Sequence, residues 1–239
     1  MSYAVMITSA INTKFGVYDG NSRLDQTLAT VASVRERIPG CTVFVLEMTG
    51  APLTDTQRTA LAHAADHLLD FTTDANVVGL YNSTDNWDVV KNVTEVMCFG
   101  NALKAFRNSG NLLNEFQRVF KISGRYTLDD RFDLSFYDEY KNQNMIVLGT
   151  QKPSQFPVAV TQSGAQHMSR LWSWPTALND EIIDFYDKSL NLMYERLAAG
   201  GYIDIEHCLY RLLDHNKILE KDSLGILGNI APNGVAIKD

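Results

Sequence analysis

The run Thr42-Val43-Phe44-Val45-Leu46 is apolar after its first residue and rich in β-branched side chains. A run of this length and composition is typical of a strand that is buried on both faces of a parallel sheet. Before it, apolar residues from Leu24 to Ile38 recur at helical spacing, and Pro39-Gly40 marks the end of that helix. After it, Thr54 and Gln57 have the spacing of a capping box. The sequence therefore predicts a buried strand between two helices.

Three more runs of strand length lie on either side of this unit, at residues 3–9, 67–71 and 118–122. Between the last two, apolar residues from Val89 to Leu103 lie on one helical face. An alternation of strands and helices is typical of a mostly parallel sheet that is flanked by helices. We therefore predict an α/β fold with a mostly parallel central sheet.

The second half of the chain has a less regular pattern. The predicted elements are strands at 145–149 and 158–160 and helices at 182–197 and from Asp204, which serves as the N-cap. Residues 225–234 are rich in Gly, Asn and Pro and are predicted to form a loop. No linker divides the chain, so we predict one domain over residues 1–239.

The composition narrows the class of protein. The chain has 239 residues, 45% of them hydrophobic, which is enough for one sizeable core. Its formal net charge of −7 disfavours a broad electrostatic contact with nucleic acid or an anionic membrane. The three cysteines lie far apart, and neither a signal peptide nor an apolar run of about 18 residues is found. We therefore expect a soluble, cytoplasmic protein with no nucleic-acid partner and no transmembrane segment.

Ligands of an open parallel sheet bind beyond the carboxyl ends of its strands. The residues at those ends are Thr8-Ser9-Ala10, Glu47, the stretch 70–74 and Ser123-Gly124-Arg125-Tyr126. The first strand is not followed by a glycine-rich dinucleotide fingerprint or a P-loop, and the sequence has no nucleophile elbow and no zinc-protease motif. The pattern thus favours a ligand site at the strand ends but none of these common chemistries.

The most informative of these ends is the run from Phe120 to Tyr126. Gly124 allows a ligand to approach the backbone closely, Arg125 offers a planar fork for phosphate, and Lys121 adds a point charge. The two cations have an alternative role, since three aspartates follow in the next loop and could pair with them. The pattern leaves both roles open.

Five stretches follow one another in a suggestive order. They are Thr8-Ser9-Ala10-Ile11, the helix that begins near Lys91 and contains Glu95, the run from Lys121 to Tyr126, Ser169-Arg170-Leu171-Trp172-Ser173-Trp174-Pro175, and Asp204-Ile205-Glu206-His207. Together they resemble small GT-A-type glycosyltransferases, which occur in bacteria and in bacteriophages, over roughly residues 3–213. The resemblance implies a single GT-A-like domain with a nucleotide-binding half at about 1–126 and an acceptor-side half at about 127–239. It implies a hexosyltransferase that takes a sugar, by default from a UDP-hexose, to an unknown glycan, lipid or protein acceptor.

The resemblance also implies roles for single residues. Those expected to bind the nucleotide-sugar donor are Thr8, Ser9, Ala10, Glu47, Lys91, Lys121, Ser123, Gly124, Arg125 and Tyr126. Those expected on the acceptor side are Trp172, Trp174 and His207, and Glu206 is expected to be the catalytic base. Structural alternatives stay open, because tryptophans are often core residues and the helix dipole favours an acidic residue in a first turn.

One position departs from the family pattern. GT-A enzymes usually have Asp-x-Asp at the end of the fourth strand, where it holds Mn²⁺ or Mg²⁺ against the diphosphate, but this chain has Ser123-Gly124-Arg125. Either Lys121 and Arg125 neutralise the diphosphate, or a metal is reached from the next loop, whose aspartates are Asp129, Asp130 and Asp133. Two adjacent aspartates are also a good turn sequence that needs no metal. Metal use is therefore left open.

Three functions fit this sequence: a nucleotide-sugar glycosyltransferase, a nucleotide-sugar-binding module with weak or no activity, and a nucleotidyltransferase. The last class usually has a glycine-rich loop directly after the first strand, and Thr8 to Thr13 contains no glycine. The binding module stays open because the metal-binding carboxylates are missing at Ser123-Gly124-Arg125. The sequence favours the glycosyltransferase.

Overall fold

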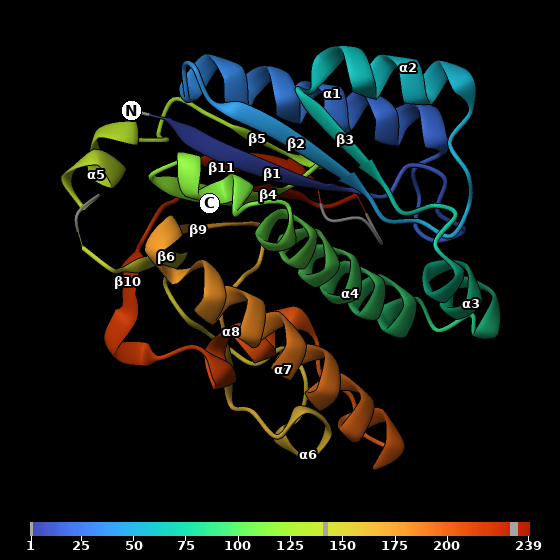
Figure 1. Cartoon of the computed structure of the whole chain (residues 1–239). Coiled ribbons are helices and arrows are strands. Elements are labelled where there is room, and N and C mark those ends of the chain that lie inside the picture. Colours follow the sequence, from blue (N-terminus) through green and yellow to red (C-terminus); the bar gives the residue numbers. More distant parts are fainter. Residues whose placement is uncertain (1, 141–142, 230–233) are drawn as a thin grey trace.

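The chain folds around a seven-stranded sheet with the strand order β10-β6-β9-β4-β1-β2-β3, as the computed structural model in Figure 1 shows. The structure describes residues 2–140, 143–229 and 234–239. At the centre, β1 (Tyr3–Ser9) is parallel to β2 (Thr42–Glu47) on one side and to β4 (Arg118–Ser123) on the other. β3 (His67–Asp70) continues the parallel part beyond β2. The predicted α/β fold with a mostly parallel central sheet is confirmed.

Beyond β4 the sheet is built by strands from the second half of the chain. β9 (Leu171–Pro175) is antiparallel to β4, with Trp172 opposite Lys121. β6 (Ile146–Gly149) is antiparallel to β9, and β10 (Ile218–Lys221) is parallel to β6. Strands from both halves of the sequence therefore share one sheet.

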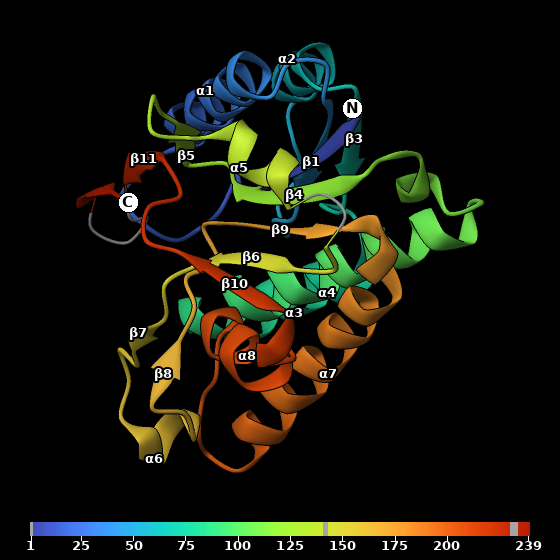
Figure 2. The same ribbon diagram turned by 90° about the vertical axis from the view of Figure 1, so that its left-hand side faces the viewer.

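Helices cover both faces of this sheet (Figures 1 and 2). One face packs against α1 (Gly20–Arg37) and α2 (Asp55–Ala64). The opposite face packs against α4 (Trp87–Asn108), α7 (Asn179–Ala198) and α8 (Ile205–Leu212). The expected start signals are present, since Thr54 and Gln57 form a capping box at α2, and Asp204 caps α8. In the ranges that the structure describes, no helix is both long and apolar enough to span a membrane.

The remaining elements are short. The further helices are α3 (Ala75–Ser83), α5 (Leu134–Glu139), α6 (Val158–Thr161) and the 3₁₀ turns Leu112–Glu115, Thr176–Leu178 and His215–Lys217. A two-stranded sheet pairs β7 (Lys152–Pro153) with β8 (Ala165–Gln166). A three-stranded sheet has the order β12 (Ala236–Lys238), β11 (Ile226–Asn229) and β5 (Tyr126–Leu128).

Two predictions for the second half were wrong. Residues 158–160 form the helical turn α6 instead of a strand, because they follow Pro157 at the surface and have no neighbouring strand to pair with in the described structure. The predicted loop 225–234 contains the strand β11, whose first residue, Ile226, is fully buried. Gly228 lets β11 approach β5, since a Cβ there would lie 2.2 Å from the Arg125 carbonyl oxygen. Residues 230–233 lie outside the described residues.

Trp172 and Trp174 are core residues, which differs from the expected acceptor-side role. Their exposed fractions are 1% and 0%, and their ring centroids lie 4.7 Å apart. Trp172 also contacts Phe185 of α7 edge to face, and the indole N–H of Trp174 donates to Asn179 at 2.9 Å. Both rings fill the space between β9 and the helices below it. Protein atoms cover their faces, so neither ring presents a stacking surface to a ligand.

Trp174→Ala is expected to lower the free energy of unfolding by about 3–5 kcal/mol, because it leaves a large cavity in the core. Urea denaturation measures this change. Tyr194→Ala, at a half-exposed ring on α7, is the matched control and is expected to change stability by no more than about 0.5 kcal/mol. Equal stability of the Trp174 variant and the parent would contradict the core assignment.

Candidate functional site

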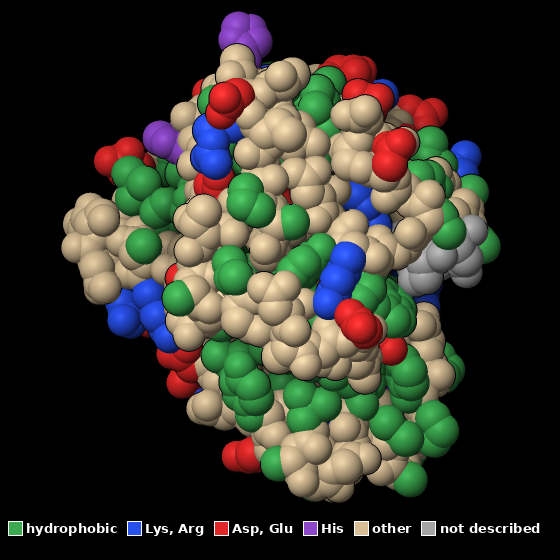
Figure 3. Space-filling view, turned by 90° about the vertical axis from the view of Figure 1, so that its right-hand side faces the viewer, with side chains coloured by type: hydrophobic (Ala, Val, Ile, Leu, Met, Phe, Trp, Pro, Cys, Tyr) green, Lys and Arg blue, Asp and Glu red, His purple; other side chains and the backbone are tan. Residues whose placement is uncertain are grey.

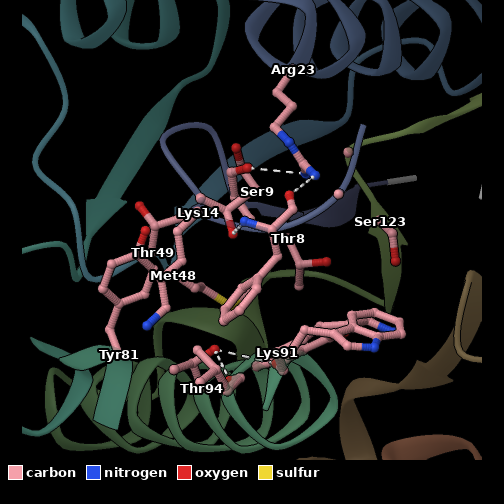
Figure 4. A pocket seen from close by; sticks show the side chains of 18 of the residues that line it. Thr8, Ser9, Lys14, Arg23, Met48, Thr49, Tyr81, Lys91, Thr94 and Ser123 are labelled. Carbon is pink, nitrogen blue, oxygen red and sulfur yellow. Dashed lines mark hydrogen bonds between the residues drawn. The ribbon is translucent and has the colours of Figure 1, made fainter. Parts of the chain in front are cut away.

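A cavity of about 370 Å³ opens at the carboxyl ends of β1 and β4 (Figure 4). Its size lies within the range of small-molecule sites, about 300–1,000 Å³. From β1 the chain passes to β2 on one side and later returns as β4 on the other side of β1. Open α/β sheets bind ligands at such a topological switch point. The cavity therefore lies where a sheet of this kind binds its ligand.

Close contact between two strand ends shapes this cavity. Thr8 pairs with Ser123, and the backbone N–H of Gly124 donates to the carbonyl oxygen of Thr8 at 2.8 Å. The carbonyl of Gly124 accepts from the hydroxyl of Thr27 on α1 at 3.3 Å. A Cβ atom at position 124 would lie 3.0 Å from both the Thr8 carbonyl oxygen and Thr27 Oγ1. A side chain there would push the two segments apart, which explains the glycine.

Seven of the ten residues predicted to bind the donor line the cavity. They are Thr8, Ser9, Ala10, Lys91, Ser123, Gly124 and Arg125. The other three, Glu47, Lys121 and Tyr126, are absent from the lining. Most of the residues that were selected because they follow strand ends therefore lie in one cavity. The identity of their ligand stays a prediction.

Lys121 is buried beneath the cavity instead of facing it. Its side chain is 1% exposed, and its ammonium forms an ion pair with Glu95 of α4 at 2.6 Å. Burial raises the pKa of the Glu95 carboxyl, but Lys121 and Lys91 more than offset this, so that pKa lies below its ordinary value. Because its charge is compensated inside the protein, Lys121 does not supply the predicted point charge for a diphosphate.

Glu47 supports the loop after β1 instead of meeting a ligand. It is fully buried and accepts hydrogen bonds from the Ser9 hydroxyl (2.6 Å), the Ile11 backbone N–H (3.0 Å) and the Thr49 hydroxyl (2.9 Å). Burial raises the pKa of this carboxyl, although the three donors oppose the rise. Tyr126 likewise lies in the core, on the α1 side of the sheet, and is 3% exposed.

The rest of the cavity wall is built by residues outside the predicted donor-binding set. The loop after β1 contributes Lys14 and Phe15, and the end of α3 contributes Tyr81. The Lys14 ammonium lies 5.2 and 5.0 Å from the ring centroids of Phe15 and Tyr81, and it bonds to Asp85 at 2.8 Å. The stretch 81–87 therefore forms part of the cavity wall. Lys14 and Asp85 are 71 positions apart in the sequence, so no local sequence pattern predicts their contact.

Three of the four cations that line the cavity, Arg23, Lys91 and Arg125, form no salt bridge among the described residues. Lys14 has Asp85, and the buried guanidinium of Arg23 bonds to three backbone carbonyls of the loop after β1. Lys91 and Arg125 are half-buried, and neither forms an ion pair within the described ranges. Burial and the nearby Arg125 lower the pKa of Arg23. Lys91 and Arg125 therefore add positive charge to the cavity without a salt bridge of their own among the described residues.

This positive charge does not extend over the surface. Figure 3 views the molecule from the side toward which β1 and β3 run in Figure 1. Basic, acidic and hydrophobic side chains are mixed on that face, without one extended charged patch. The positive charge is therefore a property of the cavity.

Glu206 lies beside the cavity and not in its lining. The Ser169 hydroxyl donates to Glu206 Oε1 at 2.6 Å. Burial and the neighbouring Asp204 raise the pKa of Glu206, whereas Lys91 and the hydrogen bond from Ser169 oppose the rise. The carbonyl oxygen of Ser169 accepts from Lys121, which pairs with Glu95 of α4, so hydrogen bonds and one ion pair connect Glu206 to the cavity lining.

His207, expected on the acceptor side, is fully buried. Its Nδ1 pairs with Asp204 at 2.5 Å, and its Nε2 shares a hydrogen bond of 2.8 Å with the hydroxyl of Ser154. Its ring also contacts Phe156. Since protein partners occupy both ring nitrogens, His207 supports the start of α8 and has no atom free to meet an acceptor.

The side chains at the cavity do not fit a divalent cation. Its two carboxylates, Asp85 and Glu95, are each paired with a lysine. The loop 129–133 does not reach the cavity, since Asp129 pairs with Arg131 and Asp133 caps α5. Across the part of the chain that the structure describes, no three His, Cys, Asp or Glu side chains are grouped to hold an ion.

Comparison with known proteins gives no relative to reason from. No protein-family model matches the chain, and no curated protein matches it. The geometry and charge of the cavity are therefore the features that bear on function.

Glu47→Gln is expected to lower the free energy of unfolding by about 1–3 kcal/mol, because the amide NH₂ would face groups that now donate to a carboxylate. Urea denaturation at neutral pH measures this loss. Glu195→Gln, at an exposed position of α7, is the control and is expected to stay within about 0.5 kcal/mol of the parent. Unchanged stability together with weaker ligand binding would return Glu47 to a direct role in the site.

Proposed function

We propose that the protein is a glycosyltransferase, and that its donor is a nucleotide-diphosphate sugar bound in the cavity at the ends of β1 and β4. The observation that carries the proposal is the pair of half-buried cations, Lys91 and Arg125, which line the cavity at the switch point of the sheet and form no salt bridge among the described residues. A diphosphate has the opposite charge, and its oxygens match the planar fork of arginine. A GT-A-type domain and a UDP-hexose donor belong to the same proposal.

The aromatic side chains at the cavity support a nucleotide in preference to a simple phosphate. Phe15, Tyr81 and Trp87 line the same cavity as the two cations. Aromatic faces stack on bases and on sugars. Thr8 and Ser123 also line the cavity, and their hydroxyls are suited to a ribose. The cavity thus has aromatic rings and cations close together, with the Lys91 ammonium 5.6 Å from the centroid of the Trp87 ring.

In the proposed reaction an acceptor hydroxyl attacks the anomeric carbon of the donor sugar. A new carbon–oxygen bond forms, the bond from that carbon to the diphosphate breaks, and the diphosphate leaves with the electron pair. Lys91 and Arg125 stabilise the charge of the leaving group. Glu206 takes the proton of the acceptor, and its raised pKa is in the direction that suits a general base near neutral pH.

Arg125→Ala is expected to weaken binding of the nucleotide sugar by about 2–3 kcal/mol, because a charge-assisted contact is lost. Arg125→Lys is expected to bind better than the alanine variant but worse than the parent, since it keeps the charge without the fork. Calorimetry measures both, after a thermal-shift screen of UDP, GDP, CMP and dTDP sugars with and without Mn²⁺ has selected the donor.

The control for this comparison is Lys188→Ala, at an exposed cation on α7. It is expected to bind the donor like the parent. No stabilisation by any nucleotide sugar would contradict the glycosyltransferase and the binding module alike. Parent-like binding in both Arg125 variants would remove Arg125 from the site.

Glu206→Gln is expected to bind the donor nearly as well as the parent and to turn over about 10²-fold more slowly, the usual scale for loss of a general base. Transfer of a labelled sugar measures turnover, and the melting temperature serves as the control for folding. Full turnover in this variant would exclude Glu206 as the base. Binding without any transfer by the parent would favour the non-catalytic binding module.

A further inference from the structure

Lys121 carries a buried charge that the proposed reaction does not use directly. A buried charge is unfavourable unless it is fully paired, and an apolar side chain would fill the same place at lower cost. The ammonium has three partners: the Glu95 carboxylate at 2.6 Å, the Ser123 hydroxyl at 3.0 Å and the Ser169 carbonyl at 2.8 Å. All three of its protons therefore have an acceptor or a partner, which holds the group in one position.

The partners of Lys121 belong to the donor cavity and to the segment that contacts the proposed base, Glu206. Glu95 and Ser123 line the donor cavity. Ser169 lies just before β9, is 5% exposed, and donates its hydroxyl to Glu206, the proposed base. The same segment is fixed to β4 by the backbone N–H of Ser123, which donates to the Arg170 carbonyl at 2.9 Å. One ammonium therefore connects the cavity to the residue that orients the base.

We propose that Lys121 is a positioning residue that holds Ser169 in place and thereby fixes the Glu206 carboxylate relative to the bound donor. The proposal rests on the proposed function, because Glu206 has this task only if a sugar is transferred. A general base acts within hydrogen-bond reach of the proton that it takes, and a displacement of about 1 Å can cost on the order of 10²-fold in rate. The hydrogen bond from Ser169 fixes the Oε1 atom of the Glu206 carboxylate.

The test compares Ser169→Ala, Lys121→Met and the double variant, with turnover measured at saturating donor across pH. Each single variant is expected to lower kcat about tenfold, the result of a base that is less well placed. The acid limb of the profile is expected to move to higher pH, because the Ser169 hydrogen bond favours the ionised form of Glu206. The double variant is expected to lose no more than the worse single variant, since both break the same chain of contacts.

Lys121→Met leaves the buried Glu95 carboxylate without its partner, and this variant could fail to fold. A second pair of variants removes that problem. Glu95→Gln removes the other charge of the buried pair, and Lys121→Met is then compared in that background. The lower kcat and the shifted acid limb are expected there too. An NMR titration of the Glu206 carboxyl carbon, which needs no turnover, is expected to show a higher pKa in Ser169→Ala and in the Lys121 variants.

The outcomes separate this proposal from the proposed function. Lower melting temperatures with an unchanged pH profile, or additive losses in the double variant, would make Lys121 a stabilising residue only and overturn the positioning role. If Glu206→Gln keeps full turnover, the base assignment fails, and the positioning role fails with it. If Glu206→Gln loses turnover while Lys121 and Ser169 variants keep the parent kcat and profile, the positioning role alone is wrong.

Discussion

The backbone hydrogen bond from Gly124 to Thr8 is the contact on which the cavity depends. It joins the end of β4 to the end of β1. After β1 the chain continues to β2, which lies on the side of β1 opposite to β4. Residues from two strands that are distant in sequence thereby meet at one edge of the sheet. The start of α4 lies across this edge and adds Lys91 to the same space. A side chain in place of the glycine would lie 3.0 Å from the Thr8 carbonyl oxygen and would crowd this contact.

The charged groups around this cavity divide into two kinds. Lys121 and Glu95 neutralise each other in the interior, whereas Lys91 and Arg125 have no such partner among the described residues. Lys121 and Arg125 are only four positions apart, yet their environments differ. The side chain of Lys121 leaves the middle of a buried strand toward the α4 face, and Arg125 follows the strand where the sheet opens. One kind of charge maintains the framework, and the other is available to a ligand.

Much of the fold was predictable, because the first four strands and their helices have strong periodicity and clear caps. The failures were at places where a distant partner decides the structure. The strand β11 has a sequence rich in glycine and asparagine, and it forms because β5, about 100 positions earlier, pairs with it. In the site, the strand-end rule found Thr8 and Arg125, which depend only on where strands end. It could not find the contact between Lys14 and Asp85, nor show that Lys121 faces inward, because both depend on tertiary packing.

Lys91 and Arg125 are half-buried cations in a protein whose formal net charge is −7. Charges are screened beyond about 8 Å at physiological ionic strength, so a distant anion responds to the average negative surface and not to these two side chains. Long-range attraction therefore does not accelerate its arrival, in contrast to proteins with an extended basic face. Under the proposed function, the anionic donor would be selected only on contact, after it has entered the cavity, and its capture would be governed by diffusion and by its orientation at the mouth.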